Sequence, residues 1–199
     1  MVARGRTVGF SSVSSSDTVT HRAAHLVALL EALRPADVVE GAHRADMLAL
    51  ARAPAGDPFA RDHWDPGHFT ASAFVLSPDE RSILLVFHGK LHRWLQPGGH
   101  VEPGDADVLA AARREIAEET GLMDCTVVGD GLFDVDVHVI PARKSDPAHR
   151  HFDARILLRA PSFAFAAGSD AVAARWVPLG EVHTVETDES VLRAVRKLG

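Results

Sequence analysis

The feature that most constrains this chain is a stretch in which a glycine turn leads into an acidic helix. Gly98 and Gly99 form the turn, and the helical segment carries Glu115, Glu118 and Glu119. At about 100° of rotation per residue, these three carboxylates fall within roughly 100° of one another and share one helix face. Like charges at this spacing destabilise a helix by about 0.2–0.5 kcal/mol per pair. A bound divalent cation would offset that repulsion.

The cation expected here is Mg²⁺ or Mn²⁺, because both prefer carboxylate, carbonyl and water oxygens. The missing side chains of Gly98 and Gly99 let backbone carbonyls approach such an ion. A run of glutamates alone is also typical of a solvated helix face. The flanking residues therefore decide between a metal site and an ordinary surface.

The ends of the acidic helix are marked by residues suited to caps. Asp107 offers a side-chain acceptor at the start, and Gly121 suits a left-handed C-terminal cap. These residues predict a helix over about 107–120. An apolar stripe about a quarter-turn from the carboxylates would anchor it; the stripe consists of Leu109, Ala112 and Ile116.

These residues resemble the Nudix box, Gly-x5-Glu-x7-Arg-Glu-U-x-Glu-Glu-x-Gly-U, in which U is an aliphatic residue. The match spans Gly99 to Leu122, and the half that begins at Arg114 agrees at every specified position. The first half departs twice: Asp105 stands in place of the glutamate, and one additional residue separates it from Arg114. Asp105 is expected to make a supporting contact or to cap the helix. The chain is thus identified as a member of the Nudix hydrolase superfamily.

The resemblance implies an α/β fold, a Nudix-like α/β/α sandwich around a mixed β-sheet, over about residues 66–199. It also implies that Arg114 orients the carboxylates and compensates their repulsion. The implied metal ligands are the side chains of Glu115, Glu118 and Glu119 and the carbonyl of Gly99. The implied catalytic residues are Glu118, Arg114 and Glu115, with Glu118 as the first choice of general base. Alternatives for the base, from later loops, are Asp146, Glu186 and Asp188.

Composition divides the chain into three segments. Residues 1–17 are rich in serine and poor in large apolar residues, which predicts a flexible tail. Residues 18–56 form an N-terminal helical extension, since apolar residues recur at helical spacing over 18–33 and 36–53 before a Pro- and Gly-rich linker. Residues 57–199 form the catalytic domain. The extension is expected to cover one side of that domain, to form half of a homodimer contact, or to shape the substrate entrance.

Hydrophobic periodicity predicts the buried residues and the strands. The inner faces of the two extension helices are expected to carry Ala23, Leu26, Leu30, Leu33, Val39, Met47 and Leu50. Strands are expected at 68–76, 82–87, 94–97, 126–128, 132–140, 151–158 and 173–177, and a C-terminal helix over 187–198. The strand at 132–140 alternates polar and apolar residues, which predicts one buried face and one solvent-facing face.

Substrate contacts are less firmly marked. His149, His151 and Asp153 alternate, so they are expected on one face of a strand, where they could contact phosphate or metal. Ordinary cross-strand hydrogen bonding is the alternative for these three residues. Trp94 could stack on a base, with core packing or rim cover as its alternative.

The predicted function is metal-dependent hydrolysis of a diphosphate linkage in a nucleoside diphosphate joined to another group, such as a nucleotide sugar, a dinucleotide or a nucleoside triphosphate. A non-catalytic sensor that binds such a nucleotide is an alternative, but it would have no need of all three acids. An RNA-end pyrophosphohydrolase is a further alternative. It would require a basic groove, and only a short one is supplied by Arg143, Lys144 and Arg150.

Composition argues against nucleic-acid-binding, membrane-spanning and secreted proteins. The formal net charge of −6 argues against a broadly basic nucleic-acid surface. No apolar run approaches the roughly 18 residues of a membrane span, and the N-terminus lacks the apolar segment of a secretion signal. A cytoplasmic protein with a small-molecule nucleotide substrate is therefore expected.

Overall fold

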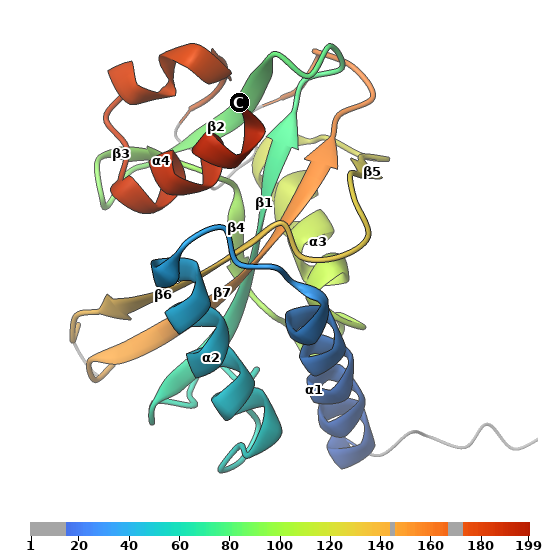
Figure 1. The fold of residues 1–199 in the computed structure, drawn as a ribbon, viewed down its shortest axis with the longest axis vertical. Helices are drawn as coiled ribbons and strands as arrows, with labels where there is room; N and C mark the ends of the chain where they lie inside the picture. Colours follow the sequence, from blue (N-terminus) through green and yellow to red (C-terminus); the bar gives the residue numbers. More distant parts are fainter. Residues whose placement is uncertain (1–14, 144–145, 167–172) are drawn as a thin grey trace, which may run out of the picture.

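The structure is a computed structural model, and it describes residues 15–143, 146–166 and 173–199. Most of the predicted tail, and Lys144, lie outside the described residues. Figure 1 shows the fold. The elements in chain order are α1 (Ser15–Ala32), α2 (Val38–Arg52), β1 (Gly67–Leu76), β2 (Ser82–His88), β3 (Arg93–Leu95), β4 (Gly98–His100), α3 (Val108–Thr120), β5 (Thr126–Val127), β6 (Asp134–Ile140), β7 (His149–Arg159), β8 (Ala174–Pro178), the 3₁₀ helix η1 (Leu179–Thr184), α4 (Glu189–Val195) and the 3₁₀ helix η2 (Arg196–Leu198).

The strands form one mixed eight-stranded sheet built around β1. Every residue of β1 is buried, because strands flank it on both edges and apolar cores cover both of its faces. It runs parallel to β7 and antiparallel to β2 and β4. The sequence predicted seven of these strands, but the turn predicted at Gly98 and Gly99 is instead the strand β4, which pairs with β1. The parallel pairing of β1 with β7 brings together residues about 80 positions apart.

Two apolar cores lie on opposite faces of this sheet. Ala71 and Ala73 of β1 share a core with Ala112 and Ile116 of α3. Phe74, on the other face of the same strand, shares a second core with α4. Helices on both faces of a mixed sheet make the α/β/α sandwich, so the predicted fold class is confirmed.

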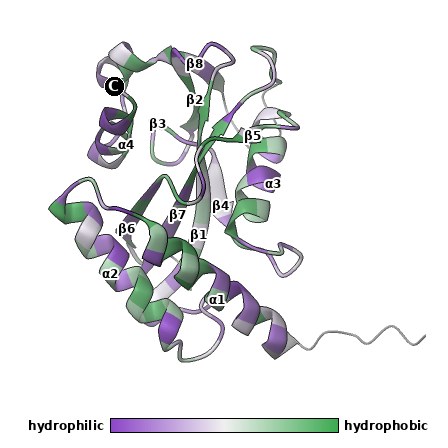
Figure 2. Ribbon diagram, turned by 45° about the vertical axis from the view of Figure 1, so that its right-hand side comes forward, coloured by the Kyte–Doolittle hydropathy of each residue, from purple (hydrophilic) through white to green (hydrophobic). Residues whose placement is uncertain are grey.

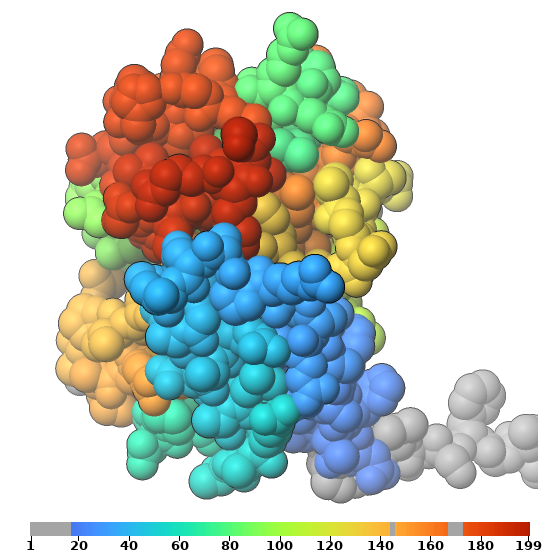
Figure 3. Space-filling model, in the orientation of Figure 1, coloured from blue at the N-terminus to red at the C-terminus, as the bar shows by residue number. Residues whose placement is uncertain are grey.

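The N-terminal helices belong to the first of these cores. Leu26 and Leu30 of α1 and Met47 of α2 are buried together with sheet residues. Figure 2 shows apolar and polar residues mixed along both helices, as expected for helices with one buried face. In Figure 3 they cover the sheet below the C-terminal elements. The expectation for Val39 is wrong, since it lies in the first turn of α2 with 47% of its surface exposed.

Three predicted boundaries or faces need correction. Helix α1 begins at Ser15, inside the predicted tail. The C-terminal helix is shorter than predicted, because α4 starts after the cap residue Asp188 and continues as the 3₁₀ helix η2. The supposed solvent-facing side of the 132–140 strand is buried at its start, where Asp134 and Asp136 pair with arginines.

Within the described part of the chain, none of the helices is both long and apolar enough to cross a membrane.

Candidate active site

The predicted caps hold the acidic helix in place. Asp107 is the N-cap of α3, and its side chain accepts a hydrogen bond from the backbone N–H of Ala110 at 2.8 Å. Gly121 ends the helix in the left-handed conformation with φ of 66°. The helix bounds therefore agree with those predicted from the sequence.

The three box glutamates occupy different environments on α3. Glu115 is largely buried, with 16% of its side chain exposed, whereas Glu118 is 52% exposed. Glu119 Oε2 accepts a hydrogen bond from the backbone N–H of Gly98 at 3.2 Å. The carboxylates of Glu115 and Glu119 therefore both lie against the two glycines of β4.

Gly99 is required by the approach of Glu115. A Cβ atom at position 99 would lie 2.5 Å from Oε1 and 2.6 Å from Cδ of Glu115, which is closer than such atoms can come. The carboxylate thus lies directly over the Gly99 backbone. Carboxylate oxygens have the donor chemistry that Mg²⁺ and Mn²⁺ prefer. Among the described residues, however, the three glutamates are not gathered as closely as a set of metal ligands would be.

Arg114 joins the box loop to the helix. Its guanidinium pairs with both oxygens of Asp105, at 3.2 Å from Nε and 2.9 Å from Nη2. Nη1 donates to Glu115 and Glu118, and Nη2 also donates to the carbonyl of His100. The additional residue of the box therefore leaves the bidentate contact between Asp105 and Arg114 intact.

These contacts shift the pKa values of Arg114 and Glu115. The hydrogen bond to Asp105, followed by the contacts with Glu115, raises the pKa of Arg114, so its positive charge is held firmly. Burial raises the pKa of Glu115 above its ordinary value, and Glu118 adds to the rise, while Arg114 opposes it. A cation beside Glu115 would relieve this cost of keeping a buried carboxylate ionised.

An arginine of the extension supports the box loop, and sequence reasoning missed it. Arg22 of α1 is buried, and Nη2 donates to the carbonyls of Glu102, Pro103 and Asp105. The available signal was an arginine next to Ala23, which lies on the predicted inner face of the helix. Helix α1 is thereby fixed to the loop that presents Asp105 to Arg114.

The predicted substrate residues other than Trp94 lie on β7. His149 and His151 of β7 contact each other, with 3.3 Å between their Nε2 atoms. Asp153 is buried and accepts hydrogen bonds from Thr70, Ser72 and Arg155, which is the cross-strand arrangement considered as its alternative. Contacts of these residues with a substrate stay predictions.

Trp94 lies apart from these residues, on β3. Its ring packs 5.3 Å from that of Phe87, and the guanidinium of Arg175 lies 4.2 Å from its centroid. The tryptophan is half-buried, so part of its surface remains open to solvent. Stacking on a base stays a prediction.

A hollow of about 780 Å³ lies between α1 and the segment that follows α2. Val19, Ala23 and Pro54 are among the residues that line it, and none of the box residues does. The candidate active site is therefore defined by the carboxylates, the glycine turn and Arg114 rather than by this hollow.

The sequence model of the NUDIX domain matches residues 66–197 of this chain. That range includes the whole candidate active site and leaves out α1 and α2. No curated protein sequence matches the chain.

Similar solved structures include three hydrolases. The E. coli dihydroneopterin triphosphate pyrophosphohydrolase has 16% identity and a TM-score of 0.52, and the match covers 65% of this chain and 92% of that chain. The Nudix hydrolase RenU from M. smegmatis has 16% identity and a TM-score of 0.50, with 66% and 83% covered. A NUDIX-family hydrolase from Clostridium perfringens has 23% identity and a TM-score of 0.49, with 66% and 98% covered. The first two share the fold of this chain.

Proposed function

The chain belongs to the Nudix family, and from this premise we propose that it hydrolyses the diphosphate linkage of a nucleoside diphosphate joined to another group, with Mg²⁺ or Mn²⁺ as cofactor. The family makes it a pyrophosphohydrolase by reaction type. The group joined to the diphosphate is a sugar, a second nucleoside or a further phosphate in the substrates that we propose.

The observation that supports the proposal is the placement of Glu115 and Glu119 against the two glycines of β4. Glu115 lies over Gly99, and Glu119 accepts from Gly98. Glu115, Glu118 and Glu119, with the Gly99 carbonyl, would hold the metal ion. When bound, the ion would neutralise charge on the phosphoryl oxygens and lower the pKa of a bound water.

The residues of the chain have distinct proposed roles. Arg114 fixes the orientation of Glu115 and Glu118 through hydrogen bonds at 2.9 and 3.1 Å. Glu118, the most exposed of the arginine's carboxylate partners, can reach water and is our choice of general base. Asp105 keeps Arg114 in place and acts as a positioning residue.

This proposal is favoured over the nucleotide sensor by the complete set of acids. A protein that only binds a nucleotide would not require a carboxylate buried at the cost of a raised pKa, as found for Glu115. It is favoured over an RNA-end pyrophosphohydrolase by charge, because the chain carries a net charge of −6.

The test is hydrolysis of a panel of nucleoside triphosphates, dinucleotides and nucleotide sugars with Mg²⁺, with Mn²⁺ and with a chelator. We expect metal-dependent release of a nucleoside monophosphate or pyrophosphate from at least one class, and no turnover with the chelator. Tight binding across the panel without turnover would overturn the proposal in favour of the sensor. Turnover only of triphosphorylated RNA would establish the RNA-end activity instead.

A further inference from the structure

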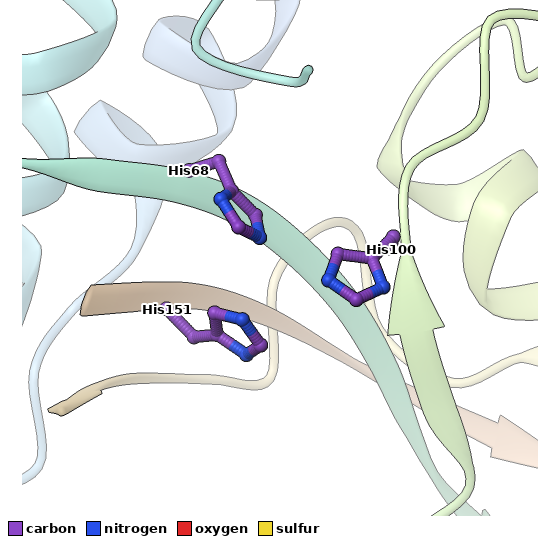
Figure 4. A group of neighbouring side chains, drawn as sticks. All are labelled: His68, His100 and His151. Carbon is purple, nitrogen blue, oxygen red and sulfur yellow. The ribbon is translucent and has the colours of Figure 1, made fainter. Parts of the chain in front are cut away.

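A second group of potential metal ligands is formed by three histidines on neighbouring strands of the sheet. His68, His100 and His151 come from β1, β4 and β7, and each offers a ring nitrogen within 4.8 Å of those of the other two. Their ring centroids are 4.7 to 5.3 Å apart. Figure 4 shows the three rings gathered around a common space.

His68 has a buried nitrogen without a partner. The residue is fully buried, and Nδ1 lies 3.4 Å from the carbonyl of His63. A carbonyl can only accept, so Nδ1 carries the proton and Nε2 presents its lone pair. This Nε2 atom is buried and has no hydrogen-bond partner. A buried lone pair of this kind needs a partner, and a metal ion coordinated by the nitrogen would be one.

The orientation of His151 is fixed by its neighbour on the same strand. His149 Nδ1 lies 2.8 Å from the carbonyl of Pro147, so it carries the proton there. Its Nε2 then accepts from Nε2–H of His151 at 3.3 Å. This leaves Nδ1 of His151 as a lone pair. A metal-binding histidine is commonly held by its other nitrogen in this way.

The three imidazoles are suited to a cation rather than to an anion. Burial, with the nearby histidines, lowers the pKa of His68 to about 4. Burial and the surrounding histidines also lower the pKa of His151. The lone pairs at Nε2 of His68 and Nδ1 of His151 suit a cation, because a phosphate oxygen would need an N–H donor at these atoms.

We propose that His68, His100 and His151 form a site for a divalent transition-metal ion, of which Zn²⁺ is the representative. Three nitrogens at the usual Zn–N distance in a tetrahedral site lie about 3.3 Å apart, so small side-chain rotations would bring these atoms to the ion. Three protein ligands leave a fourth position for water or a substrate oxygen. The site does not depend on the proposed hydrolase function.

The two sites should select different ions. The box offers carboxylates and a carbonyl, which suit Mg²⁺ and Mn²⁺, whereas imidazoles suit Zn²⁺, Ni²⁺ and Cu²⁺. The two sites are adjacent in sequence, because His100 directly follows Gly99. They are also close in space, because the backbone carbonyl of His100 accepts a hydrogen bond from Arg114 at 2.8 Å. An ion at the histidines would therefore lie beside the box without using its carboxylates.

The test is titration of metal-free protein with Zn²⁺ by calorimetry, in excess Mg²⁺ to occupy the box. The ligand variants are His100→Ala and His151→Ala, both at half-buried positions. His183→Ala, at an exposed histidine of η1, is the matched control. A triple variant with Gln at 115, 118 and 119 separates this site from the box. Circular dichroism in chelator verifies that each variant folds.

We expect the parent, the His183→Ala control and the triple box variant to bind one Zn²⁺. Each ligand variant should lose more than roughly 10- to 100-fold in affinity for Zn²⁺, which is the loss typical when a residue that only hydrogen-bonds to a metal ligand is removed. Co²⁺ should give a tetrahedral visible spectrum in the parent that both ligand variants lack. Folded ligand variants that bind Zn²⁺ as tightly as the parent would overturn the proposal. So would a parent that binds no Zn²⁺, or loss of the ion only in the triple box variant.

Discussion

The two adjacent glycines of β4 differ in which atoms an added side chain would contact. At Gly99 an added Cβ meets the end of the Glu115 side chain at 2.5 Å, which can rotate away. At Gly98 it meets Cα of Ser72 at 2.6 Å and the carbonyl of Ala71 at 2.8 Å, which are backbone atoms. The same substitution should therefore have different consequences at the two positions.

We predict that Gly99→Ala folds but displaces the Glu115 carboxylate, so that the apparent affinity for Mg²⁺ falls at least about tenfold. Gly98→Ala should instead lower the free energy of unfolding by about 1–3 kcal/mol, because the sheet must shift. Urea denaturation and the Mg²⁺ dependence of hydrolysis measure the two effects. Equal Mg²⁺ dependence in Gly99→Ala and the parent would contradict the assignment of Gly99.

At the residue scale, the box could be predicted because its residues are close in sequence. The caps and the spacing of the glutamates follow from helix geometry alone. The pairing of Arg114 with Asp105 across the additional residue depends on how the loop folds. The contacts of Arg22, about 80 positions away, depend on tertiary packing, so local patterns gave only the helix that carries it.

At the scale of elements, α1 acts on the site through the box loop. Removing the buried Arg22 side chain would take its donor from the carbonyls of Pro103 and Asp105, whereas the Glu102 carbonyl would still accept from the N–H of Asp105 at 3.0 Å. We predict that Arg22→Ala costs about 2–4 kcal/mol of stability and lowers kcat at temperatures where the protein remains folded. Arg52→Ala is the control, because Arg52 forms an exposed pair with Glu31. Similar kcat values for the two variants would show that α1 does not position the loop.

Helix α4 is tied to the sheet by buried charges. Arg193 donates to both oxygens of Asp134, at 3.0 Å each, and to the carbonyl of Val135. We predict that Arg193→Ala destabilises the fold by about 3 kcal/mol, since it removes one of the three cations that pair with the buried carboxylate of Asp134 and leaves Arg155 and Lys197. Arg196→Ala removes an exposed pair with Glu189 and should cost about 0–1 kcal/mol. Equal losses on chemical denaturation would refute the structural role of Arg193.

The same buried ion pairs explain why the expectation of a solvent-facing side for the 132–140 strand was wrong. Alternation of aspartate and valine predicts a solvent-facing side when only the strand is considered. Asp134 and Asp136 are buried because Arg155 of β7 and Arg193 of α4 reach them. Neither arginine is close in sequence, so the pattern alone could not distinguish a solvated acid from a paired one.

At the scale of the whole molecule, the pairing of strands that are distant in sequence determines which side chains lie close together. The register that places His68 beside His151 joins β1 to β7. Local periodicity predicts each strand but not this partner. The fold class was accessible because the box resemblance supplied it, whereas the histidine group requires three strands to be placed in space.

The stability of the whole molecule should depend on pH in the acidic range through the ionisation of Asp136. Burial opposes its ionisation, but the hydrogen bond from His138 and the charge of Arg155 outweigh burial and lower its pKa well below 3.8. The unfolded chain takes up a proton near pH 3.8 while the folded protein resists it. The stabilisation is therefore present above that pH and is lost as the pH falls toward the folded-state pKa.

We predict that Asp136→Asn is less stable than the parent at pH 7 by on the order of 2–3 kcal/mol. The difference should shrink as the pH falls below about 4, because the parent also loses its charge. Urea denaturation of both proteins at several pH values measures it. A difference that stays constant down to pH 2 would rule out the ionised pairing of Asp136.

The most direct test of the proposed function is the turnover of Glu118→Gln with Mg²⁺ on the best substrate of the panel. Glu181→Gln, an exposed glutamate of η1 outside the box, is the matched control. We predict that Glu118→Gln keeps the fold and stability of the parent but loses orders of magnitude in kcat, on the order of 10²–10⁴, while the control keeps normal turnover. Near-normal kcat in folded Glu118→Gln would contradict the account, because the box carboxylates would then not carry the reaction.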